Sequence, residues 1–305
     1  MSDAWPDLSH PAWRDTRETL HMFTQVVGKL KLELCPFLNQ WWEVAFALTA
    51  RGLGTGPIPH GEASFDVEFD FVAHRVVVRH SDGAERAVEL RPRSVADFHA
   101  AFMGVLAELG VDVEINTLPS EVPDPIRFEE DEVHASYDGE YAARYWRILL
   151  GVSRVMERYR TPFHGKSSPV NFYWGGFDLS ETRFTGRSIP PPAEGGRIME
   201  YGEDEENFAV GFWPGADPFP HPILYAYMIP APEGQERLSV EPGAARFEPS
   251  LGEFVLLYED ARGGGDPAAA IGAFFQSTYE ACADLAGWDR AALEGHVPPD
   301  LGRRA

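Results

Sequence analysis

The sequence predicts an α+β fold with two similar αββββα halves, and three observations support this prediction. Apolar residues follow helical spacing in some segments and strict alternation in others. The same order of segments, a helix, a Pro-Phe pair, strands and a second helix, occurs twice along the chain. Short turn sequences separate neighbouring strands, which favours antiparallel pairing. We therefore expect mainly antiparallel sheets, each covered by helices on one face, and an internal duplication.

The first half covers residues 1–115. Its two helices show apolar side chains at steps of three and four, and its strands alternate apolar and polar residues, so that one strand face is in water. The turn sequence Ser81-Asp82-Gly83 indicates a hairpin. The predicted elements are helices at 15–34 and 95–109 and strands at 41–50, 64–71, 74–80 and 86–90.

Residues 116–140 are rich in proline and acidic residues without periodicity, so we expect a linker or a surface strap. The second half, 141–305, repeats the first more loosely, with predicted surface loops inserted at 188–206 and 230–250. The alternative is that two unrelated segments share a common order of elements by chance. The predicted elements are helices at 141–160 and 267–288 and strands at 169–179, 207–213, 223–228 and 253–259.

Composition argues against several function classes. A net charge of −22 disfavours binding to nucleic acid or to an anionic membrane surface, because both need clustered basic residues. The start of the chain lacks the basic and apolar regions of a signal peptide, so we expect a soluble cytoplasmic protein. The two cysteines, Cys35 and Cys282, lie far apart in sequence and predict reduced thiols rather than a disulfide framework.

Strong catalytic and metal-binding motifs are missing from the sequence. Gly165-Lys166-Ser167 lacks both the earlier glycine and the following helix of a phosphate-binding loop. His60, His74 and Asp70 match no metal-site spacing and are better interpreted as strand-edge residues. We therefore predict no metal site, and the sequence assigns no cofactor.

The stretch from His164 to Arg187 is the richest in polar and aromatic side chains. If residues 170–178 form one strand, Asn171 and Tyr173 lie on one face, and Trp174 and Asp178 lie on the other. The pair Gly175-Gly176 removes two side chains in this segment, which indicates a bulge or the close approach of a backbone or ligand.

A functional interpretation of this stretch makes it an anion-binding or catalytic site. Lys166, Arg183 and Arg187 would hold a carboxylate or phosphate, Trp174 would stack on the ligand, and His164 would act as general acid or base. Arg183→Ala and Lys166→Ala would then leave stability nearly unchanged. The structural alternative is that Asn171 and Asp178 hold loops, the arginines pair with nearby acids, and the aromatic rings pack in the core.

A second polar line lies on the first predicted helix. His21, Gln25 and Gly28-Lys29 fall at helical steps beside the apolar stripe. If this helix crosses the sheet where the halves meet, His21 and Gln25 face the same crevice as the glycine-containing segment. The alternative is a solvated helix flank.

Several longer motifs give the chain a family resemblance. They include TLHMFTQVVGKLKL (19–32), HASYD (134–138), GKSSPVNFYWGGFDL (165–179), TRFTGR (182–187) and GFWPG (211–215). Together they resemble a bacterial family known only as a domain of unknown function, over nearly the whole chain. Because that family has no assigned activity, the resemblance implies one coherent family unit and no catalytic role for any residue.

The sequence thus favours a protein that binds a small polar or anionic molecule in a pocket between the two halves. Whether it is an enzyme using His164 is left open, as are the ligand and the reaction. The alternative is a non-catalytic interaction module, or a homodimer, that uses exposed aromatic side chains as a partner surface.

Overall fold

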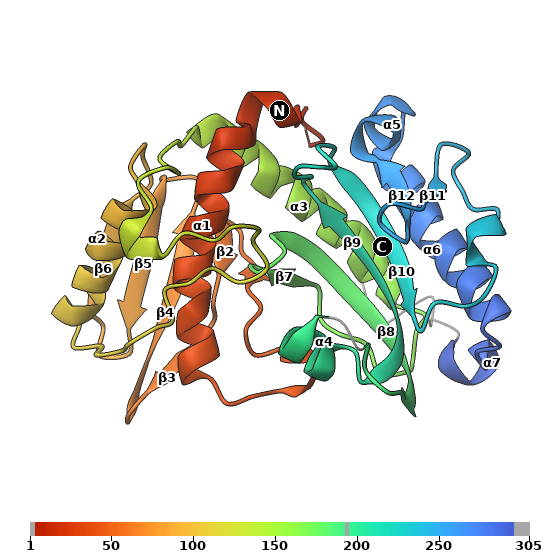
Figure 1. Ribbon diagram of the computed structural model, residues 1–305, viewed down its shortest axis with the longest axis horizontal. Helices are drawn as coiled ribbons and strands as arrows, with labels where there is room; N and C mark the ends of the chain where they lie inside the picture. The colour runs from red at the N-terminus through yellow and green to blue at the C-terminus, as the bar shows by residue number, and fades with distance from the viewer. Residues whose placement is uncertain (1–3, 193–194, 296–305) are drawn as a thin grey trace, which may run out of the picture. The chain divides into compact units, whose positions relative to one another are not determined.

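The computed structural model describes residues 4–192 and 195–295, which divide into two compact units. The first unit contains the described residues within Met1–Gly151, Asn171–Ser180 and Phe212–Pro222, and the second contains those within Val152–Val170, Glu181–Gly211 and Ile223–Ala305. Helices combine with two antiparallel sheets, so the predicted α+β class is confirmed (Figure 1). The internal duplication and the boundaries proposed for its halves stay predictions.

The first unit is built on helix α1 (His10–Leu34) and a six-stranded sheet. The sheet has the order β1-β2-β4-β5-β6, with β3 paired to β4, and helices α1 and α2 pack against it. Its elements are β1 (Ala47–Leu48), β2 (Gly52–Gly54), β3 (Ile58–His60), β4 (Ala63–Asp70), β5 (Arg75–His80), β6 (Glu85–Glu89) and α2 (Val95–Glu108).

The alternating pattern of β4 predicts the buried apolar face of the strand correctly and its polar face incorrectly. Phe65, Val67 and Phe69 are at most 2 % exposed, as the pattern predicts. Asp70, however, is 1 % exposed and accepts hydrogen bonds from Arg51 Nε and from the backbone N–H groups of residues 72 and 73. The loop before β2 therefore covers part of the strand face that we expected in water.

Trp41 and Trp42 do not lie in a strand, contrary to the prediction for 41–50. They belong to a 3₁₀ turn, η1 (Asn39–Trp41), and to the residues after it, and only Ala47–Leu48 of this segment pairs as β1. Gln40 and Trp41 both have positive φ, a conformation that interrupts an extended chain.

The segment predicted as a linker or strap lies against α1. It contains one short 3₁₀ helix, η2 (Phe128–Glu130), which packs on α2. Ser120 bonds to Gln25, and Ser136 N–H donates to Thr19 Oγ1 at 3.0 Å. Both contacts are to α1, so residues 116–138 act as a strap over this helix.

The second sheet has the order β11-β12-β10-β9-β8-β7, and α6 packs on β10 and β12. The predicted insertions contain α4 and β11, and the strand predicted at 253–259 turns into α5 after Leu257. The elements are α3 (Gly139–Arg160), β7 (Asn171–Tyr173), β8 (Asp178–Ser188), α4 (Gly196–Gly202), β9 (Glu205–Trp213), β10 (Ile223–Ile229), η3 (Gln235–Arg237), β11 (Arg246–Glu248), β12 (Glu253–Leu257), α5 (Tyr258–Gly263), α6 (Pro267–Leu285) and α7 (Arg290–Leu293).

The single strand predicted over 170–178 is wrong. Residues 174–177 form a turn, and β7 folds back on β8 with Tyr173 opposite Asp178. Phe177 has φ of 60° and its N–H donates to Tyr173 O at 2.9 Å, which closes the hairpin. The Gly175-Gly176 pair therefore marks a turn, and the assignment of alternating faces across it does not hold.

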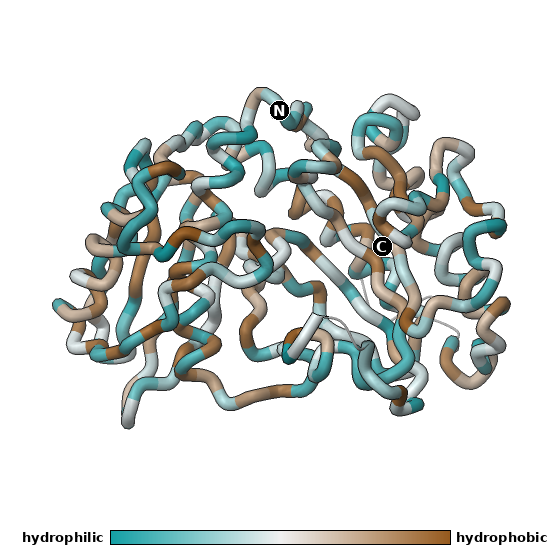
Figure 2. The backbone as a smooth tube through the Cα atoms, in the orientation of Figure 1, coloured by the Kyte–Doolittle hydropathy of each residue, from teal (hydrophilic) through white to brown (hydrophobic). Residues whose placement is uncertain are grey.

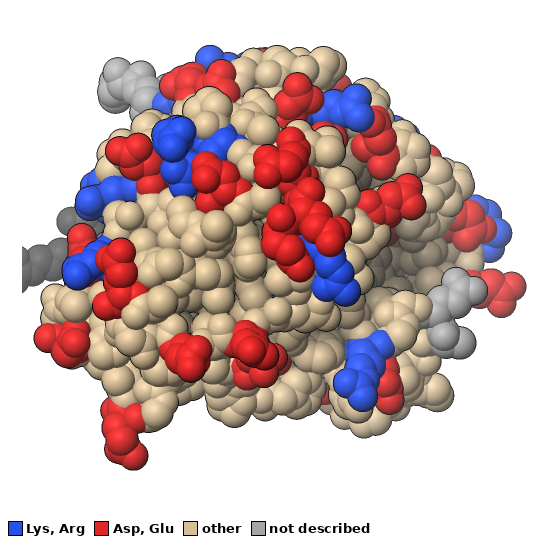
Figure 3. All heavy atoms as spheres, turned by 60° about the vertical axis from the view of Figure 1, so that its left-hand side comes forward, with Lys and Arg blue, Asp and Glu red and all other residues tan. Residues whose placement is uncertain are grey.

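Hydrophobic and charged residues are distributed as expected for a globular chain. Figure 2 shows hydrophobic residues interspersed with hydrophilic ones along the strands and helices, as elements with one buried face require. On the face in Figure 3, basic side chains are scattered among more numerous acidic ones. Within the described ranges, no helix is both long and apolar enough to cross a membrane.

Candidate functional site

Three polar residues of α1, His21, Gln25 and Lys29, lie at steps of four residues and so share one helix face. Gln25 is 0 % exposed and Lys29 is 4 % exposed. This face meets the strap and the β7–β8 turn, all within the first unit. We call these three residues, with Ser120, Glu121, Trp174 and Gly175, the α1 site.

His21 holds the hairpin turn against the helix. Its Nε2 lies 3.0 Å from Trp174 O and 2.9 Å from Gly175 O. Because carbonyl oxygens only accept, Nε2 carries the proton and donates. The imidazole also stacks on Phe177, with ring centroids 5.0 Å apart. Burial lowers the pKa of His21 to about 4, with the two carbonyls opposing the shift, so the ring is neutral at pH 7.

This lowered pKa predicts how stability depends on pH. The folded-state pKa lies below the unfolded value of 6.5, so the contribution of His21 is complete above pH 6.5 and is lost as the pH falls towards 4. At about 1.4 kcal/mol per pH unit, the loss reaches about 3 kcal/mol. In His21→Gln, which keeps a donor, urea unfolding should show a flatter pH dependence over this window. Equal slopes in both proteins would contradict the assignment.

Gln25 fixes the strap residue Ser120 by two hydrogen bonds. Its Nε2 donates to Ser120 O at 2.7 Å, and its Oε1 accepts from Ser120 N–H at 3.0 Å. Both backbone groups of Ser120 are thus paired with one side chain, which places the following residue, Glu121, beside the helix.

Lys29 and Glu121 are the two ionisable groups at this position. Lys29 Nζ donates to Ser120 Oγ at 2.6 Å and lies 5.7 Å from the centre of the Trp174 ring. Loss of hydration lowers the pKa of Lys29 and raises that of Glu121, while their mutual attraction opposes both shifts. No direct ion pair or hydrogen bond between described residues engages the Glu121 carboxylate, so the two charges attract without contact.

Glu121 is held in a strained conformation close to the hairpin turn. Its φ is 58°, a region that non-glycine residues rarely occupy. A Cβ added at Gly175 would lie 1.9 Å from Glu121 Oε1, so only glycine leaves room for this carboxylate. The sequence predicts a bulge or the approach of a backbone or ligand at this glycine pair, and the group that approaches Gly175 is instead the side chain of Glu121. Residue 121 as a whole is exposed, whereas its carboxyl group is partly dehydrated, which raises the pKa of Glu121.

Trp174 is the buried aromatic residue of the α1 site. It is 4 % exposed, and its Nε1 donates to Val44 O at 2.9 Å. The indole packs directly on α1, where a Cβ added at Gly28 would lie 2.2 Å from Trp174 Cδ2. Trp174 is therefore held from two sides.

The other predicted residues of the hairpin hold the turn. Asn171 is 8 % exposed and its Nδ2 donates to Tyr173 Oη at 3.2 Å. Asp178 pairs with Tyr173 across the hairpin, and a Cβ at Gly176 would lie 2.8 Å from its Oδ1. These contacts fit the structural interpretation of both residues.

The remaining predicted residues belong to the second unit, where the three cations have separate partners. Lys166 Nζ donates to Glu205 Oε2 at 2.7 Å, and Arg187 Nε donates to Glu206 Oε2 at 2.7 Å. Arg183 is 1 % exposed, and its guanidinium is enclosed by aromatic rings. The structure does not bring these three side chains together around a common space.

The contacts of His164 differ from those of these three cations. The residue is exposed, and its backbone N–H donates to Leu293 O at 2.7 Å. A Cβ at Gly295 would lie 1.9 Å from Cε1 of the His164 ring. The imidazole therefore packs against the backbone that follows α7. Its predicted catalytic role stays a prediction.

Sequence reasoning missed Ser120 and Glu121, which it assigned to the linker. The strap has no periodicity, so nothing local indicates which of its acids approaches α1. The sequence places Lys29 at a helical step beside the apolar stripe, but it gives no sign of the partners of this side chain. Prolines flank the pair closely at residues 119 and 123, and this is the one local sign of a fixed backbone there.

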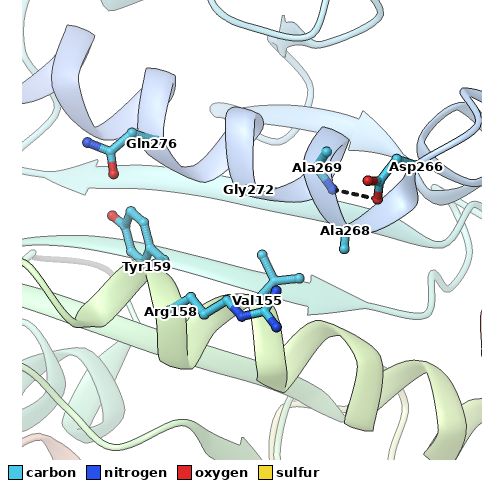
Figure 4. A pocket seen from close by; sticks show the side chains of 8 residues that line it. All are labelled: Val155, Arg158, Tyr159, Asp266, Ala268, Ala269, Gly272 and Gln276. Atoms are coloured by element: carbon cyan, nitrogen blue, oxygen red, sulfur yellow. Dashed lines mark hydrogen bonds between the residues drawn. The ribbon is translucent and has the colours of Figure 1, made fainter. Parts of the chain in front are cut away.

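A separate pocket of about 350 Å³ lies between α3 and α6 in the second unit (Figure 4). None of the predicted site residues lines it. Its acidic group, Asp266, accepts a hydrogen bond from Ala269 N–H at 3.1 Å and so caps α6. The lining residues are Val155, Arg158, Tyr159, Asp266, Ala268, Ala269, Gly272 and Gln276.

Comparison with known proteins identifies a matching family. A family model matches residues 5–295, nearly the whole chain, and this family is described as a family of unknown function (DUF5996). Neither the curated proteins nor the solved structures contain a significant match. The matched family carries no activity that could be transferred, so functional inference depends on the site geometry.

Proposed function

We propose that this chain, which belongs to the family of unknown function DUF5996, binds a small polar molecule at the α1 site of its first unit. One observation carries the proposal. Glu121 is exposed and backbone-strained, and its carboxylate lies beside a glycine without a hydrogen-bond donor from the described residues. Strain of this kind is typical of functional positions.

The charges of the site favour a ligand with both a donor and an acceptor. Lys29 supplies a cation whose remaining N–H groups can bind an acceptor, and Glu121 supplies an acceptor for a hydroxyl, amide or amine donor. Their charges cancel, which favours a neutral or zwitterionic molecule. An anionic ligand, which the sequence left open, has less support because Lys166, Arg183 and Arg187 have other partners.

The shifted pKa values also suit proton transfer. Burial raises the pKa of Glu121 and lowers that of Lys29, so each is closer to neutrality than in water. A general base works best when its pKa lies near the working pH. We propose that Glu121 accepts a proton from the bound molecule if the protein is an enzyme.

A ligand screen with Glu121→Gln tests this function. Thermal melting of the wild type should rise with neutral polar metabolites, such as polyols, amides and amino acids, and not with citrate or phosphate. The same compounds should shift Glu121→Gln much less, because its amide cannot accept as strongly or neutralise Lys29.

The matched control is Glu132→Gln, which makes the same substitution at an exposed position of the strap. It should respond like the wild type. Equal shifts in Glu121→Gln and Glu132→Gln, or stabilisation by anions alone, would refute the proposed site.

The interaction module remains the second candidate because apolar side chains are exposed near the end of α1. Leu32, Phe37 and Leu38 are 41 %, 53 % and 49 % exposed. Surfaces of this kind are typical of partner contacts when they are contiguous. The strained backbone of Glu121 and the position of its carboxylate beside Gly175 give the binding function the stronger support.

A further inference from the structure

A second carboxyl group with unusual surroundings lies in the second unit, at Glu203. It follows α4 and opens the acidic run Glu203–Glu206. Glu205 and Glu206 are engaged by Lys166 and Arg187, respectively. Glu203 instead lies against β9 and β10, and among the described residues no Lys, Arg or His side chain forms an ion pair with it.

Two neutral donors hold the Glu203 carboxylate. Asn207 Nδ2 donates to Oε2, and Tyr227 Oη donates to Oε1 at 3.4 Å. These bonds fix its orientation without neutralising it. Loss of hydration therefore dominates and raises the pKa of Glu203 to about 7, with the charge of Asp204 adding to the shift.

Asn207 provides an independent sign that a polar partner belongs here. Its side chain is 0 % exposed, and among the described residues its Oδ1 has no hydrogen-bond donor. A buried amide oxygen without a donor costs free energy, and native proteins usually satisfy it with water or a ligand.

Two tyrosine rings lie on the sheet face that also carries the side chain of Asn207. Tyr225 and Tyr227 lie two residues apart on β10, and their rings stack at 17° with centroids 6.1 Å apart. A Cβ at Gly211 would lie 2.0 Å from Tyr225 Cζ, so the phenol lies directly on the β9 backbone. The opposite face of β9 packs on α6 through Phe208 and Tyr279.

We propose that Glu203, Asn207 and the Tyr225–Tyr227 pair form a binding site for a small organic ammonium ion. An ammonium group supplies the missing positive charge to Glu203 and has a further N–H for Asn207 Oδ1. The tyrosine rings attract a cation through their faces. A neutral alcohol of the same shape offers a donor but no charge. This site is separate from the α1 site and does not depend on it.

The test compares benzylamine with benzyl alcohol, which differ mainly in charge, by isothermal titration calorimetry. Benzylamine should bind the wild type in the millimolar range or tighter, and the alcohol at least tenfold more weakly. Glu203→Gln keeps the size and one acceptor oxygen but removes the charge, so its affinity for benzylamine should fall at least tenfold. Thermal melting verifies that the variant is folded.

Two controls separate this site from general charge effects and from the α1 site. Glu200→Gln makes the same substitution on the exposed surface of α4, and Glu121→Gln alters the α1 site. Both should bind benzylamine like the wild type. The proposal is overturned if benzylamine shows no binding, if the alcohol binds equally well, or if Glu203→Gln binds no more weakly than these controls.

Discussion

Arg183→Ala should lower the free energy of unfolding by roughly 3–5 kcal/mol, the order expected when one of two opposite buried charges is removed. The guanidinium carbon lies 3.5 Å from the ring centre of Tyr159 and 4.2 Å from that of Tyr279. Its Nη2 donates to Tyr159 O. Alanine would leave a cavity between these rings and remove the cation–π attraction.

The effect is increased by Glu181, two residues before Arg183 on the same face of β8. Glu181 is 0 % exposed, and burial raises its pKa to about 7 while Arg183 and Arg160 oppose the shift. Without Arg183, the Glu181 carboxylate loses the cation that most strongly opposes the rise in its pKa. Urea unfolding at pH 7 measures the loss.

Arg187→Ala is the matched control, because it removes the same side chain from the same strand. The side chain of Arg187 is 58 % exposed and pairs with Glu206 at the surface. The loss should be below about 1 kcal/mol. If both variants lose the same stability, Arg183 is not the buried cation described above. The sequence interpretation, in which Arg183→Ala leaves stability nearly unchanged, predicts that equality.

Gly28→Ala should destabilise the protein by about 2–3 kcal/mol, although alanine favours helices by about 1 kcal/mol over glycine. The added methyl would lie 2.2–2.5 Å from three atoms of the Trp174 indole. That ring is held by Val44 O and is 4 % exposed, so it has no free space to enter. Chemical unfolding followed by tryptophan fluorescence would report both the stability loss and the displaced indole.

Gly104→Ala provides the opposite expectation at a comparable backbone position. Gly104 is an exposed residue inside α2, and a Cβ there meets nothing within 4 Å. This variant should gain up to about 1 kcal/mol through helix propensity alone. A stable Gly28→Ala protein would contradict the packing of Trp174 on α1.

Local periodicity was sufficient to predict most elements. The hairpin of β5 and β6 forms with the register Val76↔Val88 around the predicted turn, because alternation and a glycine with φ of 95° specify the same structure. Helix α1 begins at His10, five residues before the prediction, since Pro11 is suited to its first turn. The apolar stripe that guided the prediction starts only at Leu20.

The site was partly predictable, because its helical half has a periodic signal and its other half has none. The spacing of His21 and Gln25 indicated a shared face, and both contact Gly175. Glu121 reaches the same place only through the fold of the strap, which depends on the long-range bonds between Ser120 and Gln25. The burial of Arg183 was missed because charge alone gave no sign of the aromatic rings around it.

The dependence of the α1 site on one helix restricts how the chain can change over evolution. Gln25, Gly28 and Lys29 each make a different contact of the site from a single regular element. Inserting or deleting one residue before them would rotate all three about the helix axis by roughly 100° and break every contact at once. Insertions and deletions should therefore be tolerated around the strap. In the middle of α1 we expect substitutions alone to be tolerated.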